Sequence, residues 1–279
     1  SDQTKLSAQL AELYGASFGL SVRKKGNLHW LNAGISFVNG EYVNDPNLFS
    51  QAVDFLKEVL FYPNIKNHQF DQLTFDLEKN NLRLYLESLK EDKQTFASYA
   101  LQELYFENSP EQKIPGLGVV EDLDKITASS LASYYQEMMA NDQIDIFVVG
   151  DVDPDKAAEA VGQLPFESRE TVYPDLFYTQ PQVNIVKERQ VREPIVQAKL
   201  NLAYQTNVYY DEPERFALMV FNGLFGGFPH SKLFMNVREK ESLAYYASSS
   251  VDTFRGFMSV QTGIDEKNRN QVLHLIHEQ

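Results

Sequence analysis

The sequence contains no cysteine, and this absence excludes three kinds of chemistry. Its 279 residues can form no disulfide, no thiolate metal site and no cysteine nucleophile, which suits a reducing compartment and leads us to expect a cytoplasmic location. Long hydrophobic runs are missing too, because a stretch such as residues 144–150, "IDIFVVG", is too short to span a bilayer. Residues 1–20 are not a charged leader followed by an apolar stretch. We therefore expect neither membrane insertion nor export.

Positive charge is scarce. The chain has 25 Lys and Arg against 39 Asp and Glu, for a formal net charge of -14, and no basic cluster exceeds Arg23, Lys24 and Lys25. Most of the surface would repel a polyanion, so we expect no nucleic-acid partner. What the chain does have is 43% hydrophobic residues, enough to bury a sizeable core in one large domain or two ordinary ones.

Hydrophobic periodicity alternates between helix and strand along the chain. Segment 46–63 places apolar side chains at three- and four-residue steps and ends at a proline, which predicts an amphipathic helix. Segment 68–107 contains neither proline nor glycine and predicts two consecutive helices with a break near Lys90 to Lys93. Residues 143–151, "QIDIFVVGD", predict a buried strand.

The pattern then starts again after an irregular, proline-containing stretch. Residues 173–182 are the best linker candidate, and they separate a first domain, 1–172, from a second, 183–279. Residues 4–17, "TKLSAQLAELYGAS", are echoed from residue 231 by "SKLF" and then "AYYASSS". Repeats on this scale indicate duplicated domains.

The two copies start and stop at different elements. A strand and a helix at about 195–225 precede the repeated unit in the second copy, whereas the first copy begins directly with that unit. Conversely, the first copy continues through further helices after its repeated unit, and the second stops at Gln279. We therefore expect a chain truncated at both ends, whose first domain lacks its opening strand and helix.

Two spaced motifs connect the sequence to a known family. One is "GG-x-x-x-SKLF-x-x-x-RE-x-x-x-LAYY" at 226–246, and the other is "F-x-x-x-x-x-x-x-EK" at 70–79. Together they resemble the insulinase or pitrilysin-like zinc metallopeptidases, including two-subunit members such as the mitochondrial processing peptidase. The resemblance implies an α+β fold of two repeated domains, each an antiparallel sheet with helices packed on one face.

The metal site that the resemblance implies is incomplete. The family's catalytic members bind zinc through a His-x-x-Glu-His helix and a distal Glu, but that motif does not occur here, and it would lie in the opening helix that the first domain lacks. The distal ligand should follow Glu78 by seven residues, and Tyr85 stands there. A phenol, with an ordinary pKa of about 10, is a poor substitute for a carboxylate. Glu87 lies about 200° around the helix from Tyr85, since each residue turns about 100°.

These positions predict a degenerate metal site, with no cofactor in this chain and zinc in a partner subunit. A second group, His274, His277 and Glu278 in "HLIHE", shares one helix face. Its order is not that of a zinc peptidase, and a solvated helix end is the favoured interpretation.

Arg238 and Tyr245 are the candidate substrate-binding residues. In the family, residues at these positions contact the substrate beside the scissile bond, and a guanidinium and a phenol can both donate to a peptide carbonyl. Gly226 and Gly227 would allow close approach of the turn that meets the substrate. The structural alternative pairs Arg238 with a neighbouring glutamate at the surface and packs Tyr245 in the core.

The resemblance thus predicts a zinc-free subunit, without catalytic residues of its own, that closes a chamber over a catalytic zinc-bearing homologue. Its partners would be that homologue in a heterodimer, or a second copy in a homodimer, and a peptide bound as an added strand at a sheet edge. Two alternatives stay open. One is an active zinc metallopeptidase whose ligand helix lies in the missing N-terminal segment. The other is a non-catalytic scaffold or peptide-binding protein of the same fold.

Overall fold

The structure is a computed structural model that describes residues 3–170, 172–182 and 185–279. The chain divides into two compact units, each built from several separate segments. Unit 1 comprises Ser1–Arg23, Trp30–Arg83 and Val120–Tyr173, and unit 2 comprises Lys24–His29, Leu84–Val119 and Pro174–Gln279. These units follow contacts in space, so the domain boundaries expected from the repeat, at 172 and 183, stay a prediction.

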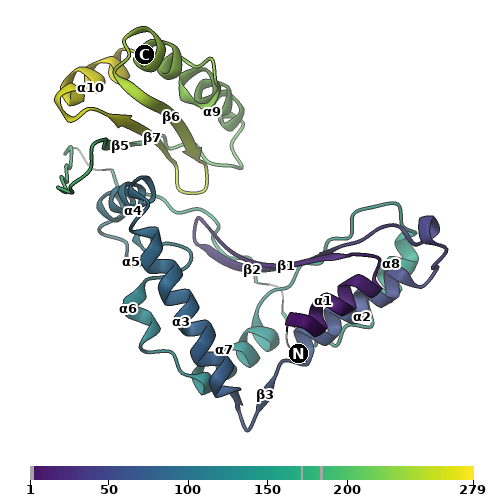
Figure 1. Cartoon of the computed structure of the whole chain (residues 1–279). Helices are drawn as coiled ribbons and strands as arrows, with labels where there is room; N and C mark the ends of the chain where they lie inside the picture. The colour runs from purple at the N-terminus through teal and green to yellow at the C-terminus, as the bar shows by residue number, and fades with distance from the viewer. Residues whose placement is uncertain (1–2, 171, 183–184) are drawn as a thin grey trace. The chain divides into compact units, whose positions relative to one another are not determined.

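Unit 1 is built on a two-stranded hairpin and a set of helices. Its helical segments are α1 (Gln3–Glu12), η1 (Gly40–Val43), α2 (Leu48–Phe61), most of α3 (Gln72–Leu89), α6 (Val120–Leu123), α7 (Ala128–Asn141) and α8 (Pro154–Val161). Its strands are β1 (Ser17–Lys25) and β2 (Leu28–Ser36), whose adjoining ends and turn, Lys24–His29, belong to unit 2, and the short pair β3 (Ile65–Lys66) and β4 (Gln69–Phe70). Figure 1 shows α1 and α2 on the same side of the hairpin.

The core of unit 1 lies between that hairpin and the two helices. Leu48 and Phe55 of α2 are buried there together with Leu13 and Ala16, which follow α1. Phe18 of β1 meets Phe55 edge-on, with ring centroids 5.3 Å apart. The apolar face predicted for segment 46–63 is therefore the face that packs on the hairpin.

One sequence prediction about unit 1 is wrong. Residues 143–151 were expected to form a buried strand, but 144–149 form no strand in the structure, and Phe147 and Val149 are 86% and 96% exposed. Apolar periodicity can mark a strand, yet a strand exists only when a neighbouring strand supplies hydrogen-bond partners. The strands that the structure describes provide none here.

Unit 2 is built on a three-stranded antiparallel sheet with the order β5-β7-β6. The strands are β5 (Ala198–Gln205), β6 (Ala244–Asp252) and β7 (Phe257–Ile264). The helical segments are the end of α3, α4 (Lys93–Tyr105), α5 (Pro110–Lys113), α9 (Glu214–Asn222), η2 (Gly223–Gly227), η3 (Leu233–Lys240), η4 (Glu266–Asn268) and α10 (Arg269–Glu278). In register, Ala198 of β5 and Ala244 of β6 both lie opposite Ile264 of β7.

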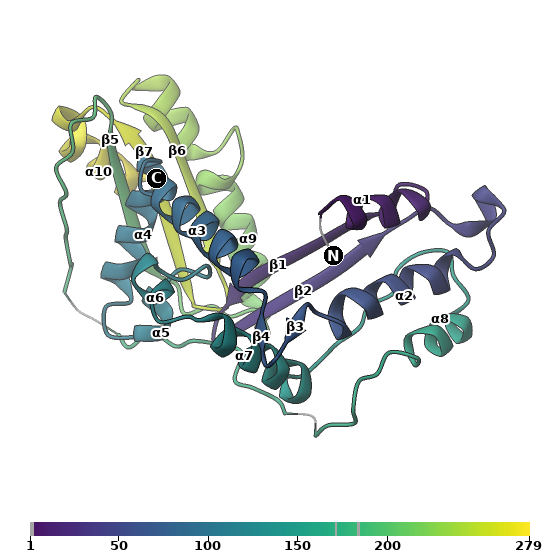
Figure 2. The ribbon, with the colours of Figure 1, turned by 60° about the horizontal axis from the view of Figure 1, so that its bottom comes forward.

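One face of this sheet carries the core of unit 2. Leu233, Val237, Val260 and Val272 are completely buried there, where η3 and α10 pack on the strands. These antiparallel sheets with their packed helices confirm the predicted α+β class. Figure 2 shows the long strands of the sheet, and α4 lies against them, contacting β5.

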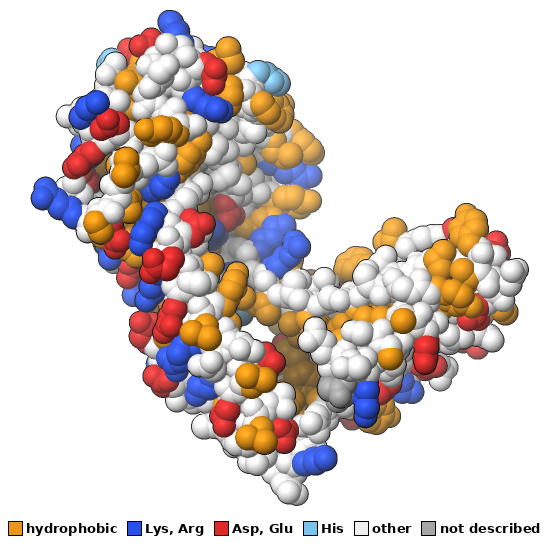
Figure 3. All heavy atoms as spheres, viewed as in Figure 1, with side chains coloured by type: hydrophobic (Ala, Val, Ile, Leu, Met, Phe, Trp, Pro, Cys, Tyr) orange, Lys and Arg blue, Asp and Glu red, His pale blue; other side chains and the backbone are white. Residues whose placement is uncertain are grey.

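The exposed side of α9 remains apolar. Phe216 and Val220 of α9 and Leu224 of η2 follow one another at four-residue steps, and each is more than half exposed. Figure 3 shows hydrophobic side chains gathered over this helix. No helix in the described part of the chain is both long and apolar enough to cross a bilayer.

The repeat seen in the sequence is also present in the order of the elements. In the first copy, α1, β1, β2, η1 and α2 follow one another, and in the second copy η3, β6, β7, η4 and α10 do so. Both copies thus run helix, strand, strand, short 3₁₀ turn, helix. The stretch from the Lys-Leu pair to the Ala-Ser pair is longer in the second copy, at 232–248, than in the first, at 5–17.

Candidate functional site

Arg238 lies on a π-helix, a rare geometry that occurs mostly as single turns and often at functional sites. In this helix, η3, the backbone N–H of Glu241 donates to the carbonyl of Asn236, five residues earlier, at 3.2 Å. The Arg238 guanidinium lies 4.5 Å from the ring centre of Phe234, and its Nε is 3.5 Å from a Glu239 carboxylate oxygen. The side chain is 41% exposed, so its contacts orient it and still leave donors accessible.

Tyr245 is the extra residue of a β-bulge at the start of β6. The pairing with β7 shifts between Ala244 and Tyr246, which leaves Tyr245 without a direct partner. Side chains normally alternate across a strand, so Ala244 and Ala247 would point to opposite faces in a regular strand. The bulge lets both enter the core, and it turns Tyr245 outward, where it is 62% exposed.

These positions decide between the two sequence interpretations only in part. Arg238 does have the neighbouring Glu239 as an ion-pair partner, as the structural alternative expects. Tyr245 is exposed, whereas that alternative requires it to be packed in the core. The structure therefore leaves Tyr245 available to a ligand.

Tyr246, the next residue, has a different environment, which the sequence did not indicate. Its hydroxyl hydrogen-bonds to the side-chain oxygen of Gln94 on α4. Burial raises the pKa of Tyr246 to about 12, and the nearby Asp92 carboxylate adds to the increase. The spacing of Ala244 and Ala247 was the available signal, because two core alanines three positions apart require a bulge in a strand.

Gly226 and Gly227 lie at the end of η2, the π-helical turn after α9. A Cβ on Gly226 would be 2.6 Å from the Ser249 hydroxyl and 2.8 Å from a Leu233 methyl, so this glycine lets η2 pack directly against β6. A Cβ on Gly227 would be 2.9 Å from the Asn222 side chain. Close packing accounts for both glycines, and their predicted substrate contact stays a prediction.

Glu78 and Tyr85 lie on α3, the long helix that carries the predicted degenerate metal position. The Tyr85 ring is 51% exposed, and Glu78 accepts a 3.4 Å hydrogen bond from Asn81. The part of the chain that the structure describes contains no group of three His, Asp or Glu side chains placed to hold a metal ion. These residues therefore do not fit a zinc site, which needs three protein ligands.

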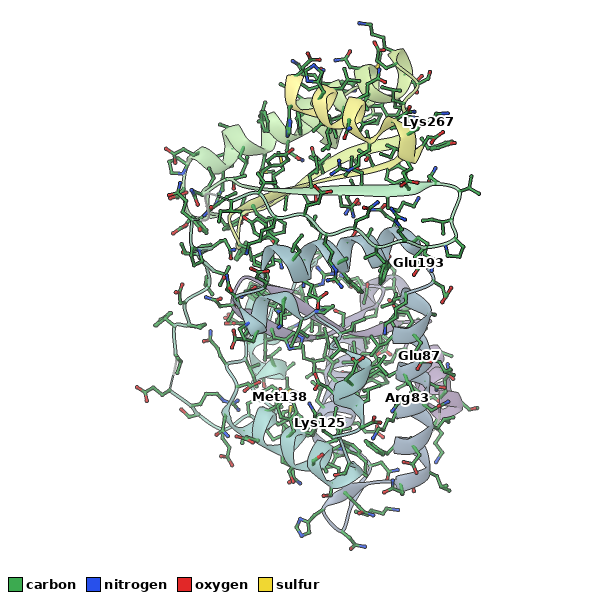
Figure 4. All side chains as sticks on the ribbon, turned by 90° about the vertical axis from the view of Figure 1, so that its left-hand side faces the viewer. Arg83, Glu87, Lys125, Met138, Glu193 and Lys267 are labelled. Carbon is green, nitrogen blue, oxygen red and sulfur yellow. The ribbon has the colours of Figure 1, made fainter. Side chains whose placement is uncertain are left out.

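Glu87 does not supply the missing carboxylate. It lies on α3 one turn from Arg83, on the side that Figure 4 shows, as expected for residues four apart. Arg83 pairs with Asp124 at 2.5 Å. Glu87 thus belongs to the face of α3 that carries this ion pair, and its placement about 200° from Tyr85 stays a prediction.

The "HLIHE" histidines make contacts of their own at the end of α10. His274 Nε2 is 3.0 Å from a Glu278 carboxylate oxygen, and the ring of His277 is 3.0 Å from the Tyr204 hydroxyl. The His274 and Glu278 side chains are 73% and 52% exposed. Their contacts are those of a solvated helix end.

The duplicated unit of helix, two strands, short turn and helix, with its antiparallel strands, defines the class of protein, a repeated α+β fold. The chain belongs to the M16 peptidase family, and residues 125–279 match the peptidase M16 inactive domain. This confirms the resemblance to insulinase and pitrilysin-like peptidases.

Three relatives illustrate the relationship. The chain is 35% identical over 276 residues to "Probable inactive metalloprotease YmfF" of Bacillus subtilis (strain 168), covering 98% of this chain. It is 60% identical to a conserved protein from Enterococcus faecalis V583, whose crystal structure matches over 99% of this chain with a TM-score of 0.93. A peptidase M16 inactive domain from Pseudomonas fluorescens shares the fold, with a TM-score of 0.70 over 100% of this chain at 18% identity.

These relatives are longer than the chain. It spans 64% of the Bacillus protein, 65% of the Enterococcus protein and 64% of the Pseudomonas protein. The family is therefore established for this chain, while the activity and partners of a whole protein are matters for proposal.

Proposed function

We propose that the protein is the zinc-free, non-catalytic subunit of a two-subunit M16 peptidase, and that Arg238 and Tyr245 bind the peptide which a catalytic homologue cleaves. The observation that carries this proposal is the irregular backbone that exposes both side chains. A π-helix holds Arg238, and a bulge turns Tyr245 away from the core. Such irregularities cost regular hydrogen bonds and are typical of functional positions.

The chemistry of the pair suits a peptide carbonyl. Arg238 presents a planar, permanently charged donor, and Tyr245 presents a neutral hydroxyl at neutral pH. Both can stabilise negative charge on the carbonyl oxygen during hydrolysis. The peptide would add as a strand beside β6, which pairs with β7 on one side and ends the sheet among the described strands.

The partnership and the location are parts of the same proposal. The match to an inactive M16 domain supports a need for a catalytic homologue, in a heterodimer, to supply the zinc. A homodimer is the simpler form of the same arrangement. Location in the cytoplasm is supported by the absence of cysteine.

A scaffold without substrate contact is the second candidate. It is favoured by the contacts of Arg238 with Glu239 and Phe234, which hold the guanidinium within its own helix. An active zinc peptidase is less well supported, because Tyr85 occupies the position where a carboxylate ligand is required.

The test removes one hydroxyl. We expect Tyr245→Phe in the full-length protein to lower the turnover of the assembled complex about a hundredfold, since one donor to a developing oxyanion is worth about 3 kcal/mol. Arg238→Lys should also lower turnover, because an ammonium cannot reproduce the planar fork of the guanidinium. Each variant is mixed with the His-x-x-Glu-His partner, assembly is verified by size-exclusion chromatography, and peptide hydrolysis is measured.

Tyr62→Phe is the matched control, because Tyr62 is also exposed, at 70%, and lies outside the η3–β6 region. It should keep full turnover. If the Tyr245→Phe and Arg238→Lys complexes assemble and cleave peptide at the wild-type rate, the pair has no substrate role and the scaffold function is correct.

A further inference from the structure

Unit 2 contains a pocket of about 580 Å³ that lies apart from Arg238 and Tyr245. Three parts of the unit line it: α4, α9 with the loop before it, and the adjoining halves of β6 and β7 with the turn between them. Lys25, at the end of β1, completes the wall. Its size is in the range of pockets that bind small organic ligands or a few residues of a peptide.

The charge of this pocket is opposite to that of the whole chain. Its lining carries Lys25, Arg215 and Arg255 against a single carboxylate, Asp252, although the chain has a formal net charge of -14. Asp252 is already engaged. It accepts from the Arg255 Nε at 2.8 Å and from the backbone N–H groups of Phe254 and Arg255 at 2.9 and 3.0 Å.

Aromatic rings hold the cations in place. Lys25 Nζ is 4.0 Å from the ring centre of Phe254 and 5.5 Å from that of Tyr210. The Arg215 guanidinium is 4.3 Å from the same Tyr210 ring. Both cations therefore contact the Tyr210 ring, and Arg215 also donates to the Tyr210 carbonyl, so this wall of the pocket carries two positive charges.

The remaining wall combines apolar and hydrogen-bonding groups. Leu101, Met219 and Phe257 supply apolar surface. The hydroxyls of Ser250 and Ser259 lie 2.9 Å apart, and whichever one accepts still has a hydrogen to donate. This mixture fits a ligand that has a carboxylate, an apolar group and an amide.

Tyr105 adds a further polar group to the wall. Its hydroxyl is buried and has no hydrogen-bond partner among the described residues. Burial raises the pKa of Tyr105 to about 12, so the phenol stays protonated and keeps its donor.

From these contacts we infer that the pocket binds the free C-terminal carboxylate of a peptide whose last residue is apolar. Arg215 and Lys25 receive the carboxylate, the apolar wall receives the last side chain, and the serine pair contacts the final peptide bond. The sequence did not single out this site. Of the residues that line the pocket, only Lys25 belonged to a pattern noted in the sequence, the Arg23-Lys24-Lys25 cluster. The inference does not depend on the proposed role of Arg238 and Tyr245.

Binding of acetyl-Ala-Phe with a free C-terminus to the full-length protein, measured by calorimetry, tests this inference. Its C-terminal amide should bind at least about tenfold more weakly, because a charge-assisted hydrogen bond contributes about 1.5 to 3 kcal/mol and 1.4 kcal/mol is tenfold. 3-Phenylpropionate, which has the carboxylate and the ring but no peptide bond, should also bind more weakly than the peptide acid. Arg215→Gln and Lys25→Gln should each weaken binding of the acid about tenfold.

Lys156→Gln, which removes an exposed lysine on α8, is the matched control and should bind like the wild type. Circular dichroism verifies that each variant is folded, and the comparison of acid and amide requires no variant. Equal binding of acid and amide, or no binding of the acid at millimolar concentration, would overturn the inference. Equal binding of 3-phenylpropionate and the peptide acid would overturn its peptide part.

Discussion

Tyr245 and Tyr246 are adjacent in β6, yet their side chains lie in different environments. The bulge turns the Tyr245 side chain toward solvent. The Tyr246 hydroxyl instead hydrogen-bonds to the side chain of Gln94 on α4. The sequence presents them as one doublet. The structure separates a hydroxyl available to a ligand from one that joins a helix to the sheet.

This difference predicts unequal effects on stability. Tyr246→Phe should lower the free energy of unfolding by about 1 kcal/mol, the typical net value of a lost hydrogen bond, whereas Tyr245→Phe should change it by less than about 0.5 kcal/mol. Urea unfolding of the full-length variants, followed by circular dichroism, measures both. Equal losses would show that the Gln94 contact does not stabilise the fold.

The same residues predict a dependence on alkaline pH. The pKa values of Tyr105 and Tyr246 are raised by burial to about 12, above the unfolded value of about 10. The folded state therefore holds these protons more tightly, and their contribution to stability is complete below pH 10 and is lost as the pH rises to about 12. Urea midpoints between pH 9 and 12 should fall less steeply for Tyr246→Phe than for the wild type. If the urea midpoints of both proteins fell equally steeply with pH, the raised pKa of Tyr246 would not contribute to the pH dependence of stability.

At the scale of elements, the η2–η3–β6 segment differs most from its counterpart in the first copy. The first copy uses the α-helix α1 and a short turn, whereas the second uses the π-helix η3, preceded by η2, and a bulge over a longer stretch. The π-helix and the bulge that leaves Tyr245 without a ladder partner both lie within this longer stretch. The copy with the irregular backbone is the one that carries Arg238 and Tyr245.

This arrangement depends on the close packing of Gly226 against Ser249 and Leu233. Gly226→Ala should destabilise the protein by about 1 to 3 kcal/mol, because the added methyl would overlap Ser249 and Leu233. Gly19→Ala is the control, since a Cβ at Gly19 would meet no atom within 4 Å. Thermal unfolding compares the two. A Gly226→Ala protein as stable as Gly19→Ala would show that η2 does not pack tightly on β6.

At the scale of the whole molecule, the sequence predicted where helices occur better than it predicted which segments contact one another. The break between α3 and α4 was predictable because Asp92 caps the second helix, accepting from the N–H groups of Gln94 and Thr95 at 2.9 Å. The strand expected at 143–151 failed, since periodicity does not reveal whether a neighbouring strand is present. The bulge at Tyr245 and the pocket around Arg215 arise from contacts between segments distant in sequence, which spacing alone does not encode.

The zinc content of the purified full-length protein tests the central claim, that this M16 homologue is not itself a zinc peptidase. Metal analysis after purification without chelators, together with a peptide-hydrolysis assay of the isolated protein, makes the measurement. The account predicts zinc far below one ion per chain and no hydrolysis in the absence of a partner. About one zinc per chain, the stoichiometry of a single three-ligand site, with hydrolysis that a chelator abolishes, would contradict it.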